Sequence, residues 1–400
     1  MSQDTKSGLL SLPLSGRIDS GSAPALEAEI SSALDAAPGA SRLVLDAERL
    51  EYISSAGLRV LMRLLKRPGT TVAVENVSPE VYEVFQATGF TELMEVRRRP
   101  REISVEGCEI IGRGAYGTVY RIDPDTVVKV YEIPGAVEII RNEHRMAKCA
   151  FLKGIPTPIS FDIVRVGQWY GSMFELVNAR TLNDLFIEQP PRRAELLRTH
   201  ANIMRQVHSA EMSPGDLPDA RTLYLQQLDA VRPLLPEAVS AKLEALLAAM
   251  PEDLHLIHGD FHMKNIMLSE GEPLLIDMET LSTGDPVFDF AGLSVAYELF
   301  NEDEPDNSQR FLGLPKAVCD TIVPSLLKDY LSSPEEALLE EAGRRIRIAA
   351  WLRFLYLVYT RDAGGAPLKE QRIRHAVQAL GGMLSQTDAL ALRPLLAELS

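Results

Sequence analysis

Apolar positions in the first hundred residues follow two alternating periods. Every second residue is apolar over 10–14, which predicts a strand, and apolar residues return every fourth position over 25–34, which predicts a helix. The pattern continues with an apolar run at 43–45, a helix after 54–55, a strand at 71–75 and a helix at 79–88. Strands that alternate with helices predict an α/β unit in which helices cover a sheet.

Four short segments of this unit carry a family resemblance. They are 16–19 (GRID), 52–61 (YISSAGLRVL), 76–79 (NVSP) and 88–90 (TGF). Over residues 8–97 the chain resembles a STAS domain of the anti-sigma factor antagonist type. In that family a partner kinase phosphorylates a Ser before this helix, which switches the choice of protein partner. The resemblance therefore implies Ser55 as a candidate phosphorylation site and a protein partner for this domain.

The serines before the helix have two readings. A phosphate on Ser55 would be favoured by the exposed N–H groups and the dipole at a helix N-terminus. Alternatively, Ser54 or Ser55 is only an N-cap. Ser54 also stands where many members of the family have Asp, which departs from the pattern of phosphate regulation.

A basic run with a proline, at 97–101 (RRRPR), separates this unit from the rest of the chain. We predict a STAS domain over 1–98 and a basic linker over 99–105. Basic runs are usually solvated, and an anionic partner is the alternative.

The strand pattern resumes after residue 106 with a G-x-G-x-x-G-x-V run. Its members are Gly112, Gly114, Gly117 and Val119. The same glycine spacing opens dinucleotide-binding folds, but there a helix follows. Here two strands follow, joined by a turn at 123–125, so a hairpin is predicted. A glycine-rich hairpin favours a loop that covers the phosphates of ATP.

Lys129 lies within a largely apolar strand. Taken alone it would be a surface lysine. After a glycine-rich loop it is better explained by an acid on the next helix, Glu143, with Glu138 as the fallback. Such an ion pair would direct Lys129 toward the α- and β-phosphates.

A second apolar strand at 172–177 ends before a polar segment. In a kinase-like fold this is the hinge between the lobes. Its backbone from Glu175 to Val177 would hydrogen-bond adenine.

A mainly helical run over 182–253 leads to the segment 256–266 (LIHGDFHMKNI). It places a carboxylate, Asp260, and an amide, Asn265, on one tight loop, and Asp277 follows after an apolar strand. Phosphoryl transfer from Mg·ATP needs such a set, with Asp260 as base and Asn265 and Asp277 holding Mg²⁺. His258 and His262 flank the base, and we expect packing or hydrogen bonds within the loop from them rather than metal binding.

Together with the Gly-Asp-Pro sequence at 284–286 and Asp289, these motifs resemble the aminoglycoside phosphotransferase and choline kinase-like branch of the protein kinase fold. The resemblance covers about residues 106–362. It implies a two-lobed α+β domain with an N-lobe over 106–180 and a largely helical C-lobe over 181–400. It also implies that Asp285 and Asp289 stabilise the catalytic loop. The alternative for Asp285 is a turn residue before Pro286.

Two departures from protein kinases are visible. Gly259 stands where many protein kinases have an Arg that binds a phosphorylated activation loop, and Met278 and Glu279 replace the Phe-Gly after the metal-binding Asp. Control through an activation loop is therefore not expected.

Composition narrows the partners. A formal net charge of −15 argues against nucleic-acid binding, which needs clustered Lys and Arg. The most apolar late segment, 348–359, is interrupted by Arg353 and is too short to cross a membrane. The N-terminus lacks the apolar core of a signal peptide, so a cytoplasmic protein is expected. Acids for a cationic acceptor are expected among Glu298, Glu302 and Asp303.

The sequence thus predicts an ATP- and Mg²⁺-dependent phosphotransferase that acts on a hydroxyl of a small molecule, aminoglycoside-like or amino alcohol-like, with a regulatory STAS domain. The alternative is a partner-switching regulator whose kinase-like domain senses ATP or phosphorylates Ser55.

Overall fold

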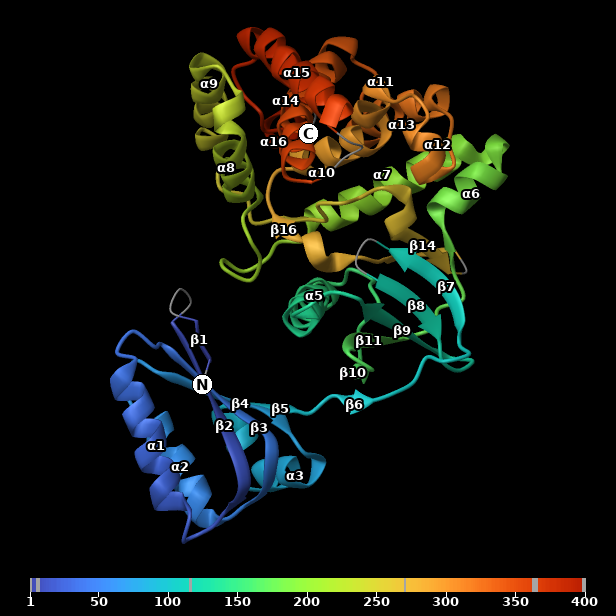
Figure 1. Ribbon diagram of the computed structural model, residues 1–400. Coiled ribbons are helices and arrows are strands. Elements are labelled where there is room, and N and C mark those ends of the chain that lie inside the picture. Colours follow the sequence, from blue (N-terminus) through green and yellow to red (C-terminus); the bar gives the residue numbers. More distant parts are fainter. Residues whose placement is uncertain (1, 5–7, 115–116, 270, 362–365, 398–400) are drawn as a thin grey trace. The chain divides into compact units, whose positions relative to one another are not determined.

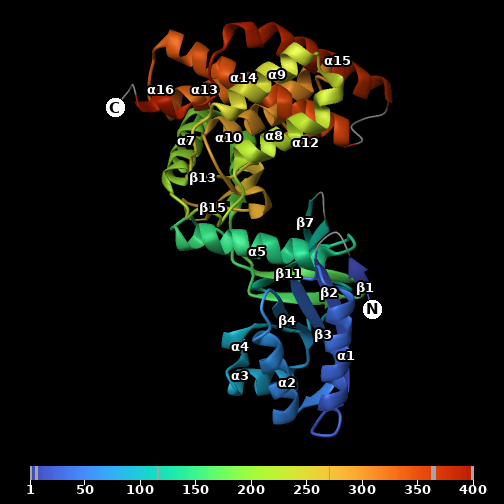
Figure 2. The same ribbon diagram turned by 90° about the vertical axis from the view of Figure 1, so that its left-hand side faces the viewer.

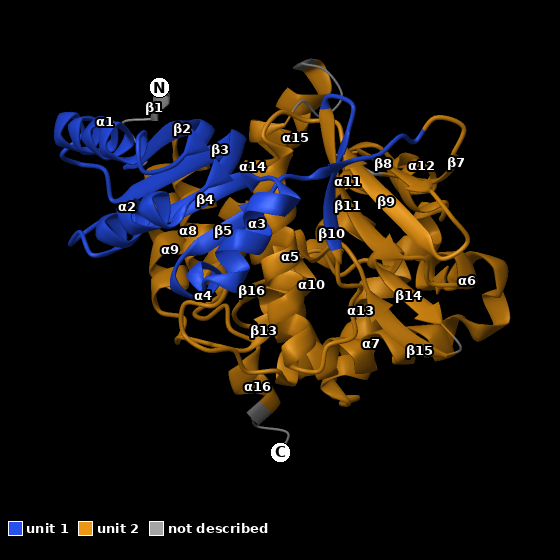
Figure 3. Cartoon of the chain, turned by 90° about the horizontal axis from the view of Figure 1, so that it is seen from below, with its two compact units in different colours: residues 1–105, 162–168 blue, residues 106–161, 169–400 orange. Residues whose placement is uncertain are grey.

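The computed structural model describes residues 2–4, 8–114, 117–269, 271–361 and 366–397 (Figure 1). The chain divides into two compact units (Figure 3). The first comprises residues 1–105 with 162–168, and the second comprises 106–161 with 169–400. Each unit has its own hydrophobic core.

A five-stranded sheet forms the first unit, in the order β1-β2-β3-β4-β5. The strands are β1 (Ser2–Asp4), β2 (Leu9–Ile18), β3 (Arg42–Ile53), β4 (Thr71–Val77) and β5 (Glu95–Arg98). Neighbours from β2 to β5 run parallel, and β1 is antiparallel to β2. The helices are α1 (Ala23–Ala36), α2 (Ser55–Leu65), α3 (Pro79–Ala87) and α4 (Phe90–Leu93). Apolar residues of these helices and of the alternating strands share one core, so the predicted α/β architecture is confirmed.

The basic run is used in contacts within the first unit. Arg97 pairs with Glu75 at 2.7 Å, and the Arg98 guanidinium lies 4.0 Å from the centre of the Tyr82 ring. Part of the predicted linker is a short strand, β6 (Arg101–Glu102), which pairs in parallel with β10 (Asp162–Val166).

The second unit begins with an antiparallel sheet and one long helix. Its strands are β7 (Glu109–Gly114), β8 (Gly117–Arg121), β9 (Thr126–Tyr131) and β11 (Trp169–Glu175), paired in the order β7-β8-β9-β11. The predicted hairpin is therefore present as β8 and β9. Helix α5 (Ala136–Leu152) lies beside β11 (Figure 2).

The remainder of this unit is largely helical, as predicted. Its main helices are α6 (Leu182–Glu188), α7 (Arg193–Ser209), α8 (Ala220–Val231), α9 (Glu237–Ala248), α10 (Val287–Ser294), α11 (Phe300–Asp303), α12 (Asn307–Leu312), α13 (Lys316–Leu331), α14 (Glu336–Thr360), α15 (Ala366–Met383) and α16 (Arg393–Ala397). Short strands β12 (Arg180–Thr181), β13 (Leu256–Ile257), β14 (Ile266–Ser269), β15 (Glu272–Leu275) and β16 (Ser282–Thr283) lie between them. Trp351 and Phe354 of α14 are fully buried in the core. Within the described residues, no helix has the length and apolar character needed to span a membrane.

Gly57 is predicted to be essential for packing in the first unit. A Cβ at this position of α2 would lie 2.6 Å from Ile18 Cγ2 and 2.7 Å from Ile53 Cγ1. Because both neighbours are buried, Gly57→Ala should lower the free energy of opening of β2 and β3 by about 1–3 kcal/mol. Amide hydrogen exchange with mass spectrometry measures this in the full-length protein.

The matched control is Gly39→Ala, where an added Cβ meets nothing within 4 Å. Equal exchange protection in both variants would contradict the tight contact at Gly57.

Candidate active site

The loop that carries Asp260 follows β13, and distant side chains hold its backbone. The Asp289 carboxylate on α10 accepts hydrogen bonds from the N–H groups of His258, at 2.9 Å, and Gly259, at 2.6 Å. Thr280 Oγ1 donates to the His258 carbonyl at 2.7 Å, and Arg353 of α14 donates to the Gly259 carbonyl at 2.8 Å. All four polar backbone atoms of these two residues are therefore bound by side chains, which fixes the direction of the loop.

Asp289 remains an anion although it is fully buried. Burial alone would raise its pKa, but hydrogen bonds from His208 and from the His258 amide hold the pKa below its ordinary value. His208 Nε2 lies 2.9 Å from Asp289 Oδ2, and its Nδ1 lies 3.0 Å from the Tyr330 hydroxyl. Asp289 thus has the loop contacts that the family resemblance implied.

Asp285 has a different role from the one implied. Its carboxylate accepts hydrogen bonds from the amides of Val287, Leu392 and Arg393 at 2.8–2.9 Å. The contact with Val287 agrees with the alternative of a turn residue, and the other two hydrogen bonds hold the C-terminal segment rather than the catalytic loop.

Gly259 is required by geometry. Its φ is +82°, and a Cβ would lie 2.5 Å from the Thr280 carbonyl oxygen. An arginine at this position, as in many protein kinases, would collide with that backbone.

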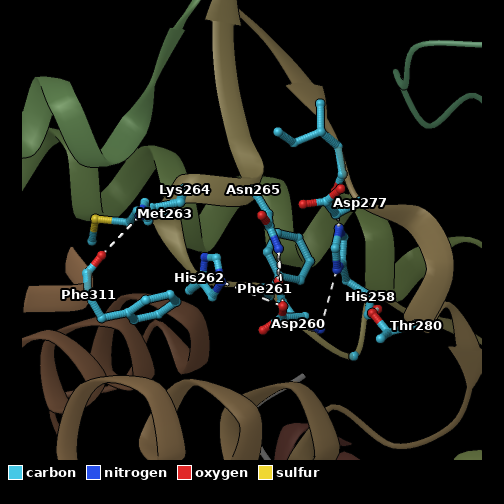
Figure 4. A network of polar contacts seen from close by, with 12 residues as sticks. His258, Asp260, Phe261, His262, Met263, Lys264, Asn265, Asp277, Thr280 and Phe311 are labelled. Carbon is cyan, nitrogen blue, oxygen red and sulfur yellow. Dashed lines mark hydrogen bonds and ion pairs between the residues drawn. The ribbon is translucent and has the colours of Figure 1, made fainter. Parts of the chain in front are cut away.

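Asp260 is bound on one side of its carboxylate (Figure 4). Its Oδ2 lies 3.3 Å from Asn265 Nδ2 and 3.5 Å from His262 Nε2. Asn265 Nδ2 also donates to the Asp260 carbonyl at 2.9 Å. The amide nitrogen of Asn265 therefore faces Asp260, and its Oδ1 is the atom suited to a metal ion.

The two histidines of the loop behave as expected. His258 is fully buried, and its Nε2 lies 3.1 Å from the Ile276 carbonyl. Burial lowers the pKa of His262, whose ring packs against Phe311. Among the described residues there is no group of three or more His, Cys, Asp or Glu that could hold a metal ion.

Asp277 follows β15 after one intervening residue, Ile276, and lies beside the loop. The Ile276 amide donates to the Asn265 carbonyl at 3.0 Å, which brings the two predicted metal ligands together. Asp277 has a left-handed backbone, with φ 57°, and its Oδ1 lies 2.9 Å from Lys129 Nζ.

The predicted ion pair of Lys129 with Glu143 is present at 3.3 Å. Burial tends to lower the pKa of Lys129, but the charges of Asp277 and Glu143 raise it well above its ordinary value, so the side chain stays cationic. The additional contact with Asp277 was not predicted.

Lys129, Glu143 and Asp277 border a cavity of about 310 Å³ in the second unit. The predicted nucleotide-binding residues on its wall are Gly112, Gly117, Val119, Lys129, Glu143, Glu175 and Val177, together with the predicted metal ligand Asp277. Gly114 is the last residue of β7, and the tip of the glycine-rich loop, 115–116, lies outside the described residues. The Leu176 amide donates to the Asp125 carbonyl at 2.7 Å, so adenine would have to use other backbone groups of this segment.

Position 117 requires glycine for a steric reason that the motif did not reveal. A Cβ at Gly117 would lie 1.8 Å from the Val130 carbonyl oxygen on the paired strand β9. Only glycine therefore lets β8 and β9 pair this closely.

Several residues of the site escaped sequence reasoning. Burial raises the pKa of Glu279; the charge of Lys129 opposes this increase, and the charges of Glu143, Asp277 and Asp260 add to it. The sequence feature that could have indicated Glu279 as a site residue is its position two residues after Asp277. The polar residues Thr157, Ser160 and Ser172 also line the cavity, and no local pattern marks them.

The structure distinguishes the roles of Ser54 and Ser55 in the first unit. Ser54 is the N-cap of α2, with its side chain accepting from the Ala56 amide at 3.2 Å. Ser55 is exposed at the first position of that helix. The cap therefore leaves Ser55 accessible, and its phosphorylation remains a prediction.

Comparison with known proteins identifies both units. Residues 107–312, more than half of the 400, match the model of the phosphotransferase enzyme family. The chain belongs to this phosphotransferase family. Residues 1–95 match the model described as Mlab, STAS domain.

One relative covers the STAS domain of this phosphotransferase. It is BtrV of Bordetella bronchiseptica, named as a candidate anti-sigma factor antagonist. The two are 40% identical over 100 residues, which is 24% of this chain and 84% of BtrV.

Solved structures resemble the phosphotransferase more distantly. The ADP-bound aminoglycoside phosphotransferase APH(2'')-Ib is 13% identical, with a TM-score of 0.49, over 77% of this chain and 99% of its own. A choline/ethanolamine kinase family protein from Mesorhizobium loti is 16% identical, with a TM-score of 0.46, over 72% and 91%. Since both scores are below 0.5, the family assignment depends on the sequence match.

Replacing Asp289 with Asn should destabilise the second unit. The amide offers one acceptor oxygen where the carboxylate binds several donors, so the free energy of unfolding at pH 7 should fall by about 3 kcal/mol. Trp169 and Trp351 both lie in this unit, so denaturant unfolding followed by tryptophan fluorescence reports on it.

The effect should depend on pH with a defined sign. The pKa of Asp289 is lower in the folded protein, so its contribution is present above the unfolded value of about 3.9 and is lost as the pH falls through the folded value. The difference between wild type and Asp289→Asn should therefore narrow at acid pH. Asp320→Asn, which removes a surface pair with Lys316, should change stability by less than about 1 kcal/mol.

Proposed function

We propose that the protein transfers the γ-phosphoryl group of Mg·ATP to a hydroxyl of a small molecule. The observation that carries this proposal is that Asn265, one predicted metal ligand, links the predicted base, Asp260, to the segment of the other predicted ligand, Asp277. Its side chain binds Asp260, and its carbonyl accepts from the residue before Asp277. Membership in the phosphotransferase family supports the same reaction.

Asp260 is proposed to act on the acceptor. Because both of its side-chain contacts fall on Oδ2, Oδ1 is suited to accept the proton of the acceptor hydroxyl. As the hydroxyl oxygen of the acceptor forms a bond to the γ-phosphorus, the bond between the γ-phosphorus and the β,γ-bridging oxygen breaks. The bridging oxygen leaves with ADP. Lys129, supported by Glu143, would steady the phosphates of the donor.

Asn265 Oδ1 and the Asp277 carboxylate fit Mg²⁺ because hard cations prefer oxygen ligands. Bound there, Mg²⁺ would neutralise charge on the phosphates. ATP as the donor also makes the cytoplasm the proposed location.

For the acceptor, we propose aminoglycoside-like and amino alcohol-like molecules as the first class to test. The acids expected to bind a cation already have partners in the protein. Arg347 contacts Glu298 at 3.7 Å and Glu302 at 2.7 Å, and His375 contacts Asp303 at 3.2 Å. A cationic acceptor that used these acids would have to replace Arg347 or His375.

Partner switching through the STAS domain is the second candidate function. The observation that favours it is the exposed Ser55 at the start of the 11-residue helix α2, in a domain 40% identical to BtrV. In this alternative the kinase-like unit senses ATP or phosphorylates Ser55.

Asp260→Asn should reduce phosphoryl transfer by about 10²–10⁴-fold, because an amide cannot accept the proton. The affinity for Mg·ATP should stay close to that of the wild type. Release of ADP with a panel of hydroxyl acceptors and calorimetric ATP binding measure the two quantities. Transfer by Asp260→Asn at the wild-type rate would exclude Asp260 as the base.

Self-phosphorylation should be visible in intact-mass spectrometry after incubation with Mg·ATP. In the partner-switching alternative, wild type gains one phosphate, and Ser55→Ala and Asp260→Asn gain none. Ser54→Ala is the matched control and should still be modified. If the wild-type mass is unchanged, Ser55 is not a substrate of this chain.

A further inference from the structure

Strand β9 presents two functional side chains to helix α5. Lys129 and Tyr131 are two positions apart, so they lie on the same face of the strand. Lys129 Nζ lies 5.0 Å from the centre of the Tyr131 ring. Tyr131 is fully buried, and its hydroxyl donates a hydrogen bond to Glu143 Oε2. The Lys129 and Glu143 pair therefore has a third member.

The two oxygens of Glu143 have separate partners. Oε1 lies 3.3 Å from Lys129 Nζ, and Oε2 is bound by Tyr131. Lys129 itself is closer to Asp277, at 2.9 Å, so two carboxylates compete for one ammonium group. Of the two carboxylate contacts of Lys129, the one with Glu143 is the longer. Because Lys129 is shared in this way, it does not hold Glu143 in place by itself.

A buried carboxylate needs a hydrogen bond on each oxygen. The Glu143 side chain is only 11% exposed, so a missing donor could not be fully replaced by water. Burial, and secondarily the charge of Glu143, raise the pKa of Tyr131. The phenol therefore stays protonated and remains a donor at neutral pH.

We infer that Tyr131 is a positioning residue for nucleotide binding, because its hydroxyl keeps the Glu143 carboxylate directed at Lys129. The inference rests on the proposed function, since it concerns the phosphate contact of Lys129. Without the hydroxyl, Glu143 Oε2 loses its donor, the carboxylate turns away, and Lys129 is left to Asp277. Lys129 is then less available to a nucleotide.

The test is Tyr131→Phe in the full-length protein, with the dissociation constant of Mg·ATP measured by calorimetry. Removing a hydrogen bond to a charged group should weaken binding roughly tenfold. Tyr170→Phe is the matched control, because Tyr170 lies directly opposite Tyr131 on β11. Its affinity should equal that of the wild type.

A double-mutant cycle separates positioning from a general effect on the fold. If Tyr131 acts through Glu143, adding Tyr131→Phe to Glu143→Gln should change the affinity by less than about twofold. A general loss of folding would instead multiply the two effects. Multiplied losses, or a Tyr131→Phe variant with wild-type affinity, would overturn the inference alone. Failure of the wild type to bind Mg·ATP would overturn the proposed function together with it.

Discussion

The buried carboxylate of Asp289 is the constraint on which the candidate active site depends. An anion in the protein interior must be satisfied by donors, and here these are His208 and the amides of His258 and Gly259. Those amides precede Asp260, so satisfying the charge also sets the direction of the catalytic loop. Arg353 and Thr280 bind the carbonyls of the same two residues. Helices α7, α10 and α14 thus each contribute a side chain to the network that holds this short loop.

The nucleotide side of the site is governed by shared charge. Lys129 lies between Asp277 and Glu143, and both carboxylates are needed for different reasons. Asp277 is a proposed metal ligand, and Glu143 supports the lysine. In this arrangement each charged group has a protein partner of opposite sign, and a Mg·nucleotide would supply the same charges. The hairpin above depends on Gly117, whose missing side chain lets β8 and β9 pair closely.

The STAS domain is a separate structural unit of this phosphotransferase. Its core is independent of the second unit, and Ser54 already caps α2, so Ser55 is not needed for that purpose. Two arginines of the basic run, Arg97 and Arg98, contact Glu75 and Tyr82 of the same unit.

The sequence by itself determined the features that depend on neighbours along the chain. Alternating apolar residues specified the strand at 10–14, two strand segments joined by a turn at 123–125 specified the hairpin, and short spacing placed Asp260 and Asn265 on one loop. The pair of Lys129 with Glu143 was accessible because only a strand end and a helix separate them. Only the tertiary structure decided the roles of Arg353, which is 94 positions from Gly259, and of His208, which is 81 positions from Asp289. It also moved Asp285 from the loop to the C-terminal segment. These contacts join distant parts of the chain, and local periodicity carries no information about which buried donor will meet which acceptor.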